Sequence, residues 1–239
     1  MTPSESGFEK VLVGNVPVSA INFNELIQEI TTEHEDGRYF AFVNAKSIVD
    51  ADENPEYAKS LAQSWVNSPD GMPVAKLLGW KLGKKQDRVS GPDVFKYFME
   101  LENLDKHFLL GSTNDCLEKI KQKASTQIVG TYSPPFVEPT KSDIENWASM
   151  ISEVGATHVW LGLGSPKQDL SGLQLAQILG NTVLGVGAAF DFYAETVLRA
   201  PRVIQTIGLE WLYRLLLNPK KMYQRYLFGG FKLLKIMSR

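Results

Sequence analysis

The stretch Trp65-Val66-Asn67-Ser68-Pro69-Asp70-Gly71-Met72-Pro73-Val74 decides the fold class, because a strand end, a turn and a helix start follow one another within it. Its first two residues are apolar and typical of the end of a strand, whereas Pro69 and Gly71 indicate a tight turn. Pro73 fits the first turn of a helix, where the missing N–H of proline costs nothing. Asp70 is therefore predicted on the turn between a strand and a helix.

Two interpretations of Asp70 follow from this position. In open α/β sheets, ligands bind in the crevice beyond the carboxyl ends of the strands, so an acid there is a candidate catalytic group. An aspartate at the start of a helix also commonly caps it, by accepting a hydrogen bond from the first helical N–H groups. The stretch alone is compatible with both roles.

The same alternation of strand and helix recurs along the chain. Strands are predicted over 11–13, 17–21, 39–43, 108–110, 127–131, 158–163 and 182–186. Helices are predicted up to 30, after 44–47 and over 55–64, 115–124, 142–154 and 170–179, with another opened by Gly91-Pro92-Asp93. The alternation predicts an α/β fold with a Rossmann-like, mainly parallel sheet flanked by helices, preceded by a hairpin formed by the first two strands.

The composition fits one large domain with a substantial core, since 44% of the 239 residues are hydrophobic and 22% are charged. The formal net charge of −2 argues against a nucleic-acid partner, but the charge is unevenly distributed. From residue 199 onward, Glu210 is the one acid among many lysines and arginines. We therefore divide the chain into an α/β core, 1–198, and a basic, amphipathic helical appendage, 199–239.

The appendage mixes large apolar and aromatic residues with basic ones, over 208–217 and again over 223–236. Such helices can lie in a membrane interface, where each basic residue contributes about 1 kcal/mol near an anionic surface. They can equally cover the core with their apolar face. We expect the part up to Leu217 to pack on the core and the part from Lys220 onward to face anionic lipid.

Cysteine usage and the N-terminus indicate the compartment. Cys116 is the only cysteine, so no internal disulfide forms, which fits a reducing compartment and a small core residue on a helix. The first residues lack the pattern of a signal peptide, and no apolar run reaches the roughly 18 residues that span a bilayer. We expect a cytoplasmic protein that associates peripherally with the inner face of the cell membrane.

Glycine-containing turns follow several predicted strands, at Gly111-Ser112, Gly162-Leu163-Gly164 and Gly185-Val186-Gly187. Glycine lets backbone N–H groups approach an anion closely, and the next helix adds positive charge, so a nucleotide diphosphate is a natural ligand. Such glycines also occur for packing alone. No P-loop motif is present, nor a GxGxxG with an acid about 20 residues later.

Gly164-Ser165-Pro166-Lys167-Gln168 places a cation and an amide after a rigid turn. Lys167 can neutralise phosphate and Gln168 can bind sugar hydroxyls, although Lys167 can also be a solvated surface charge. Arg88 can supply a second cation with bidentate phosphate geometry, or be a surface arginine. The histidines have no spacing typical of metal ligation, so we predict neither a metal site nor a cofactor.

Taken together, these segments resemble the WecG/TagA/CpsF family of bacterial glycosyltransferases over most of the chain. The most specific run is Gly185-Val186-Gly187-Ala188-Ala189-Phe190-Asp191, followed by Arg199-Ala200-Pro201 and by the block from Gly208 to Pro219. Further blocks match in order at Asn44-Ala45-Lys46, Asp70-Gly71, Arg88 to Asp93 and Gly164 to Gln168.

The resemblance implies an inverting, metal-independent transferase that moves a sugar from a UDP-sugar to a lipid-pyrophosphate-linked saccharide at the cytoplasmic membrane. The acid matching Asp70 is the general base. Residues of the matching blocks are expected to bind substrate: Asn44, Gly71, Arg88, Asp93, Gly164, Lys167, Gln168, Gly187 and Asp191. Basic residues of the appendage are expected at the lipid pyrophosphate and membrane: Arg214, Lys220, Lys221 and Arg225. Phe42, Lys221 and Gln224 depart from residues common in the family, so the donor and acceptor sugars stay open.

Two other classes explain part of the sequence. A Rossmann-type enzyme that uses NAD or S-adenosylmethionine accounts for the glycine turns, but not for the basic appendage or the Asp70 turn. A non-catalytic membrane adaptor accounts for the appendage, but not for the polar residues at the strand ends. The sequence also leaves homo-oligomer formation open.

Overall fold

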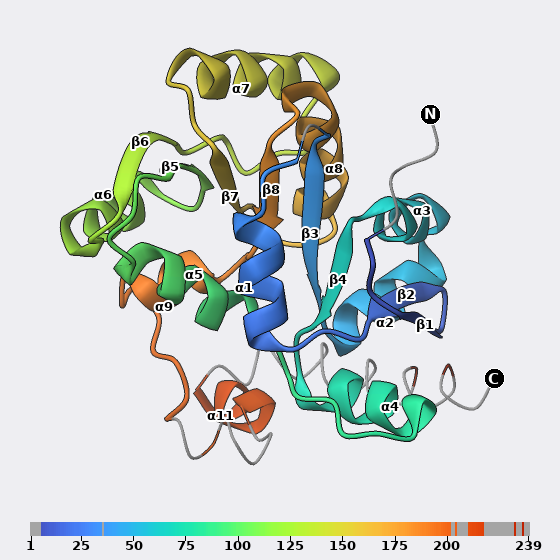
Figure 1. The fold of residues 1–239 in the computed structure, drawn as a ribbon. Coiled ribbons are helices and arrows are strands. Elements are labelled where there is room, and N and C mark those ends of the chain that lie inside the picture. Colours follow the sequence, from blue (N-terminus) through green and yellow to red (C-terminus); the bar gives the residue numbers. More distant parts are fainter. Residues whose placement is uncertain are drawn as a thin grey trace.

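The computed structural model describes residues 6–34, 36–201, 204, 210–217, 232 and 236. Its centre is a six-stranded parallel sheet in the order β4-β3-β8-β7-β5-β6 (Figure 1). The strands are β3 (Arg38–Val43), β4 (Val66–Pro69), β5 (Lys106–Gly111), β6 (Gln127–Tyr132), β7 (His158–Gly162) and β8 (Thr182–Gly185). The predicted α/β fold with a mainly parallel sheet is confirmed.

Both faces of this sheet are buried, and strand β3 shows why. Its side chains alternate between two apolar clusters, Tyr39, Ala41 and Val43 entering one, Phe40 and Phe42 the other. A strand covered by helices on both sides needs apolar residues at every position, as parallel strands usually have.

Helices contribute apolar residues to the two clusters in separate groups. The first cluster receives α2 (Ala45–Glu53), α3 (Pro55–Gln63), α4 (Met72–Leu82), α7 (Lys141–Glu153) and α8 (Lys167–Leu179). The second receives α1 (Phe23–Thr31), α5 (Gly91–Glu100), α6 (Asn114–Lys123) and α9 (Ala189–Tyr193). Cys116 is a buried residue of α6, as the sequence predicts.

The N-terminal hairpin is confirmed as β1 (Lys10–Val13) paired antiparallel with β2 (Val16–Ser19). It lies against the edge strand β4, where Asn67 Nδ2 donates to Pro17 O at 2.9 Å and Asn67 N donates to Ser19 Oγ at 3.1 Å. The hairpin therefore covers a sheet edge that would otherwise present unpaired backbone groups.

Several predicted boundaries are wrong. Strand β2 ends at Ser19 rather than at residue 21. Strand β4 continues to Pro69, because an edge strand tolerates a residue without an N–H. Helix α8 begins at Lys167, so Lys167 and Gln168 lie in its first turn rather than in the preceding loop.

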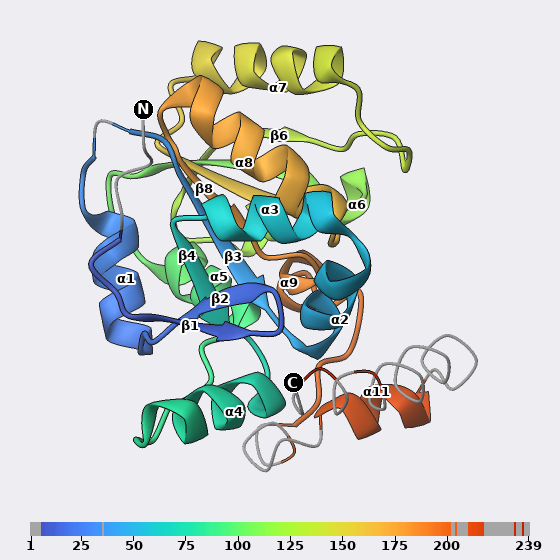
Figure 2. The same cartoon turned by 90° about the vertical axis from the view of Figure 1, so that its right-hand side faces the viewer.

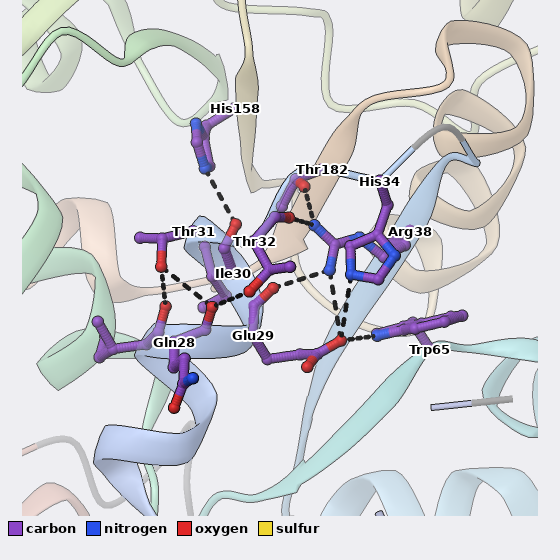
Figure 3. A network of polar contacts seen from close by, with 11 residues as sticks. Gln28, Glu29, Ile30, Thr31, Thr32, His34, Arg38, Trp65, His158 and Thr182 are labelled. Atoms are coloured by element: carbon purple, nitrogen blue, oxygen red, sulfur yellow. Dashed lines mark hydrogen bonds and ion pairs between the residues drawn. The ribbon is translucent and has the colours of Figure 1, made fainter. Parts of the chain in front are cut away.

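A buried arginine fastens α1 to the amino-terminal edge of the sheet (Figure 3). Arg38 Nη1 donates to Glu29 O at 2.7 Å, and Arg38 Nη2 donates to Thr32 O at 2.6 Å and to Thr182 Oγ1 at 3.1 Å. Trp65 Nε1 donates to Glu29 Oε1 at 2.6 Å. Burial lowers the pKa of Arg38 and the Glu29 charge opposes that shift, so the network ties α1 to β3, β4 and β8 with a paired charge.

The appendage is described in part. Helix α11 (Glu210–Leu217) lies beyond the carboxyl edge of the sheet, on the same side as α4 (Figures 1 and 2). Near the chain end, Lys232 pairs with Glu53, and Ile236 is buried beside Gly14 and Ile48. Within the described ranges, no helix is long and apolar enough to cross a bilayer. The division at residue 198 and membrane binding by the appendage stay predictions.

Candidate active site

Asp70 and Asn44 lie next to each other at the carboxyl edge of the sheet. Strands β3 and β4 pair so that Val43 stands opposite Pro69, and Asp70 N donates to Val43 O at 2.8 Å. A Cβ placed on Gly71 would stand 3.8 Å from Asn44 Cβ. Parallel pairing thus brings together two predicted site residues that are far apart in sequence.

The N-cap of α4 is Gly71, not Asp70, so the capping interpretation of Asp70 is wrong. Gly71 has φ of +129°, a conformation that side-chain-bearing residues rarely adopt, and it has no side chain with which to cap. The turn therefore places the Asp70 carboxylate one residue before the helix. Asp70 is partly exposed there.

Asn44 caps α2, since its Oδ1 accepts from Lys46 N at 2.9 Å and from Ser47 N at 3.3 Å. Among the residues that the structure describes, none accepts a hydrogen bond from Asn44 Nδ2. The cap fixes the rotamer of Asn44 and leaves this amide nitrogen as the group that can bind a substrate oxygen.

Arg88 and Arg199 meet at the carboxylate of Asp93, on the first turn of α5. Arg88 Nη2 lies 3.3 Å from Asp93 Oδ2, and Arg199 Nη1 donates to Asp93 Oδ1 at 2.7 Å. Ser90 Oγ donates to Asp93 Oδ2 at 2.5 Å. Burial raises the pKa of Asp93, but hydrogen bonds from Arg199 and Ser90 and the two arginine charges outweigh burial and hold that pKa below its usual value.

This charged group stands at the same sheet edge as Asp70. Val89 N donates to Pro69 O at 3.0 Å, which ties the segment before α5 to the end of β4. A Cβ on Gly91 would come within 3.4 Å of Val186 and 3.3 Å of Phe42, so the absence of a side chain lets α5 begin against the ends of β3 and β8. Asp70, Asn44 and the Arg88–Asp93–Arg199 group therefore border one edge.

Gln168 is buried, and both ends of its amide bind the protein. Its Nε2 donates to Gly185 O at 3.0 Å and to Ser165 Oγ at 3.3 Å, while Oε1 accepts from Gly164 N at 3.2 Å. Gly187 is adjacent, since a Cβ there would lie 3.5 Å from Gln168 Oε1. Gln168 therefore joins the turns after β7 and β8, and both its amide oxygen and its amide nitrogen are hydrogen-bonded within the protein.

Backbone amides of the glycine turns are also engaged by the protein. Val186 N and Gly187 N both donate to Leu161 O at 3.0 Å, and Ser112 N donates to Gly162 O at 3.3 Å. Each of these hydrogen bonds would have to break before the amide could hold a phosphate. These amides therefore hold the turns together in the described structure.

Two more predicted residues, Lys167 and Asp191, bind other parts of the protein. Lys167 Nζ donates to Val137 O at 3.2 Å. Asp191, on α9, accepts from Ser112 Oγ at 3.2 Å beyond the end of β5. Arg214 belongs to α11, and the other predicted appendage residues lie outside the described residues: Lys220, Lys221 and Arg225.

Sequence reasoning missed two groups. Arg199 appears in a matched block, but nothing local to residue 199 shows that it pairs with Asp93. Asp169 accepts from Tyr39 OH at 2.7 Å and from Tyr57 OH at 3.0 Å behind the Gln168 turn. Burial raises the pKa of Asp169, and hydrogen bonds from Ser165 and the tyrosines oppose that shift.

An acid, an amide and two guanidinium groups beyond the carboxyl ends of parallel strands define a class, the α/β proteins that bind ligands at this edge. The chain matches the glycosyl transferase WecG/TagA/CpsF family over residues 11–239 and belongs to that family. It is therefore a glycosyltransferase of cell-surface polysaccharide synthesis, with a sugar donor and a sugar acceptor as substrates.

Proposed function

We propose that this glycosyltransferase moves a hexose, N-acetylhexosamine or uronic acid from a UDP-sugar to an undecaprenyl-pyrophosphate-linked saccharide, with inversion and without a metal ion. One observation carries the proposal: Asp70 stands outside α4, beside Asn44 and at the same sheet edge as Arg88. A base, a hydrogen-bonding amide and a cation in one place are what sugar transfer from a nucleotide diphosphate requires.

In the proposed reaction, Asp70 removes the proton from the acceptor hydroxyl as its oxygen attacks the anomeric carbon. The bond between that carbon and the β-phosphate oxygen breaks, and its electron pair leaves with UDP. General-base assistance of this kind contributes about 10²- to 10⁴-fold. Asp70 then returns its proton to solvent before the next turnover.

The departing diphosphate needs positive charge, and Arg88 is the described residue best placed to supply it. Asp93, which also accepts a hydrogen bond from Ser90, pairs with this guanidinium and favours a fixed orientation. A planar guanidinium binds phosphate bidentately. We assign the lipid pyrophosphate to the basic appendage, Arg214, Lys220, Lys221 and Arg225, at the inner face of the cell membrane.

The test is a transfer assay with a panel of UDP-sugars and a synthetic lipid-pyrophosphate disaccharide. We expect one donor to give a product of inverted anomeric configuration and UDP in equal amounts. Thermal-shift measurements with UDP, NAD and S-adenosylmethionine distinguish this proposal from a Rossmann-type enzyme. Of the three ligands, only UDP should raise the melting temperature. Stabilisation by NAD or S-adenosylmethionine, or product with retained configuration, would contradict the proposal.

A further inference from the structure

Helix α4 carries an exposed tryptophan on the face that turns away from the core. Val74, Leu77 and Leu78 of α4 are buried, whereas Trp80 is 77% exposed. A folded chain gains nothing from leaving a large indole in water, and the exposed positions Pro73, Lys76 and Trp80 recur at helical spacing along one face. This face is built from one aromatic and basic side chains rather than from the small polar residues of an ordinary surface.

The charge around Trp80 is strongly positive. From Met72 to Asp87 the chain has four lysines against the single acid Asp87, although the whole chain carries −2. Lys84 lies 3.7 Å from Glu9 and Lys85 lies 2.9 Å from Asp87, in exposed pairs. Lys76 and Lys81 form no ion pair with any residue that the structure describes.

Both views of the molecule put α4 and α11 on the same side, beyond the carboxyl edge of the sheet (Figures 1 and 2). Helix α11 exposes Leu216, which is 74% accessible. A flat partner that met the active-site edge would therefore touch both helices together.

We propose that the exposed face of α4, centred on Trp80 with Lys76, Lys81, Lys84 and Lys85, docks on an anionic lipid bilayer. Tryptophan is enriched at the level of lipid headgroups, where the ring is buried and the N–H stays hydrated. Lysine is favoured beside anionic lipid but depleted in the core of protein interfaces, so the charge pattern selects a membrane over a protein.

This face adds a contact on the core to the one assigned to the appendage. It rests on the proposed function only in placing the sheet edge at a membrane, and needs neither a donor nor an acceptor. Each lysine near an anionic surface is expected to strengthen binding about fivefold. Two membrane contacts on one side would hold Asp70 at a fixed height above the lipid.

The test is flotation of the full chain with vesicles of phosphatidylglycerol and phosphatidylcholine, and with phosphatidylcholine alone. The double variant Lys76→Glu, Lys81→Glu should lose at least about 25-fold in partitioning to the anionic vesicles. A matched control with Lys119→Glu and Lys141→Glu, on α6 and α7, should bind as the unaltered chain does. Trp80→Ser should weaken binding several-fold, and circular dichroism should be unchanged in every variant.

Vesicles that contain brominated lipid locate Trp80 itself. Bromine should quench part of the intrinsic fluorescence of a Trp211→Phe chain, whose α11 carries no tryptophan, and adding Trp80→Phe should remove that part while the protein stays bound. Anionic-vesicle binding unaffected by the α4 substitutions would overturn the proposal, as would quenching that persists without Trp80. Variants that alter only the oligomeric state in sedimentation would show that the face binds protein instead. A failed transfer assay would leave these results untouched.

Discussion

Arg199 Nη1 and Asp93 Oδ1 lie 2.7 Å apart, although 106 residues separate them in the sequence. Asp93 also holds Arg88 on its other oxygen, so one carboxylate orients a guanidinium of the core and a guanidinium at the start of the appendage. The sequence alone predicts that Asp93 binds substrate. The hydrogen bonds favour a positioning role instead.

We expect Asp93→Asn and Arg199→Ala each to weaken UDP binding, because Arg88 loses its fixed orientation in both. Their combination should be little worse than either alone, since residues of one network couple by about 0.5–3 kcal/mol. Isothermal titration with UDP measures all of these affinities. Glu100→Gln serves as the control, because it breaks an exposed ion pair at the C-terminal end of α5, away from Asp93.

The two roles of Asp93 predict different results. If Asp93 contacts the substrate directly, Arg199→Ala should leave the affinity for UDP intact while Asp93→Asn lowers it. Additive losses in the double variant would likewise argue against a shared network.

Asp70→Asn tests the general base. The substitution removes the charge without removing a helix cap, because Gly71 occupies the N-cap of α4. We expect kcat to fall by about 10²- to 10⁴-fold, with UDP affinity and melting temperature nearly unchanged. Asp87→Asn, at an exposed carboxylate in the segment between α4 and α5, should retain activity. Full turnover by Asp70→Asn would exclude Asp70 from the role.

Gln168→Ala separates a structural amide from a substrate-binding amide. The change removes a partner of the buried Gly185 O, at about 1–3 kcal/mol, whereas Gly164 is exposed and its N–H can turn to water. Urea unfolding should therefore show lower stability together with lower activity. Lys167→Ala should change stability by less than about 0.5 kcal/mol. If Gln168→Ala lost activity while its stability stayed unchanged, Gln168 would instead contact the sugar directly.

The sequence predicts the sheet because its signal is local. Alternating strand and helix segments and glycine turns are all read within a few residues. The strand order β4-β3-β8-β7-β5-β6 is not local, and it decides which side chains meet. That Asp93 meets Arg199 therefore appears only in the folded chain.

The histidines show the same limit. His107 and His158 are far apart in sequence, but β5 and β7 pair them directly, with ring centroids 5.3 Å apart. The sequence places His158 on a predicted strand and His107 just before one, and only the register between the two strands makes them neighbours. Glu29 and Arg38 are another pair of this kind, joined because α1 packs at the start of β3.

This histidine pair predicts how stability depends on pH. Burial, and then the His158 charge, lowers the pKa of His107 from 6.5 to about 3, and burial also lowers that of His158. Below pH 6.5 the unfolded chain takes up protons that the folded chain refuses. The contribution of the neutral pair to stability is therefore fully present above that pH. On acidification the free energy of unfolding falls by about 1.4 kcal/mol per pH unit for each proton that only the unfolded chain binds.

His107→Gln measures this contribution. Its amide oxygen can still accept from Trp160 Nε1, as His107 Nδ1 does at 3.0 Å, but it cannot be protonated. Urea unfolding between neutral pH and pH 4 should show a shallower loss of stability than in the unaltered chain. Leu61→Ala, a buried position in the other apolar cluster, should lower stability equally at every pH. A slope that His107→Gln leaves unchanged would mean that other groups cause the acid sensitivity.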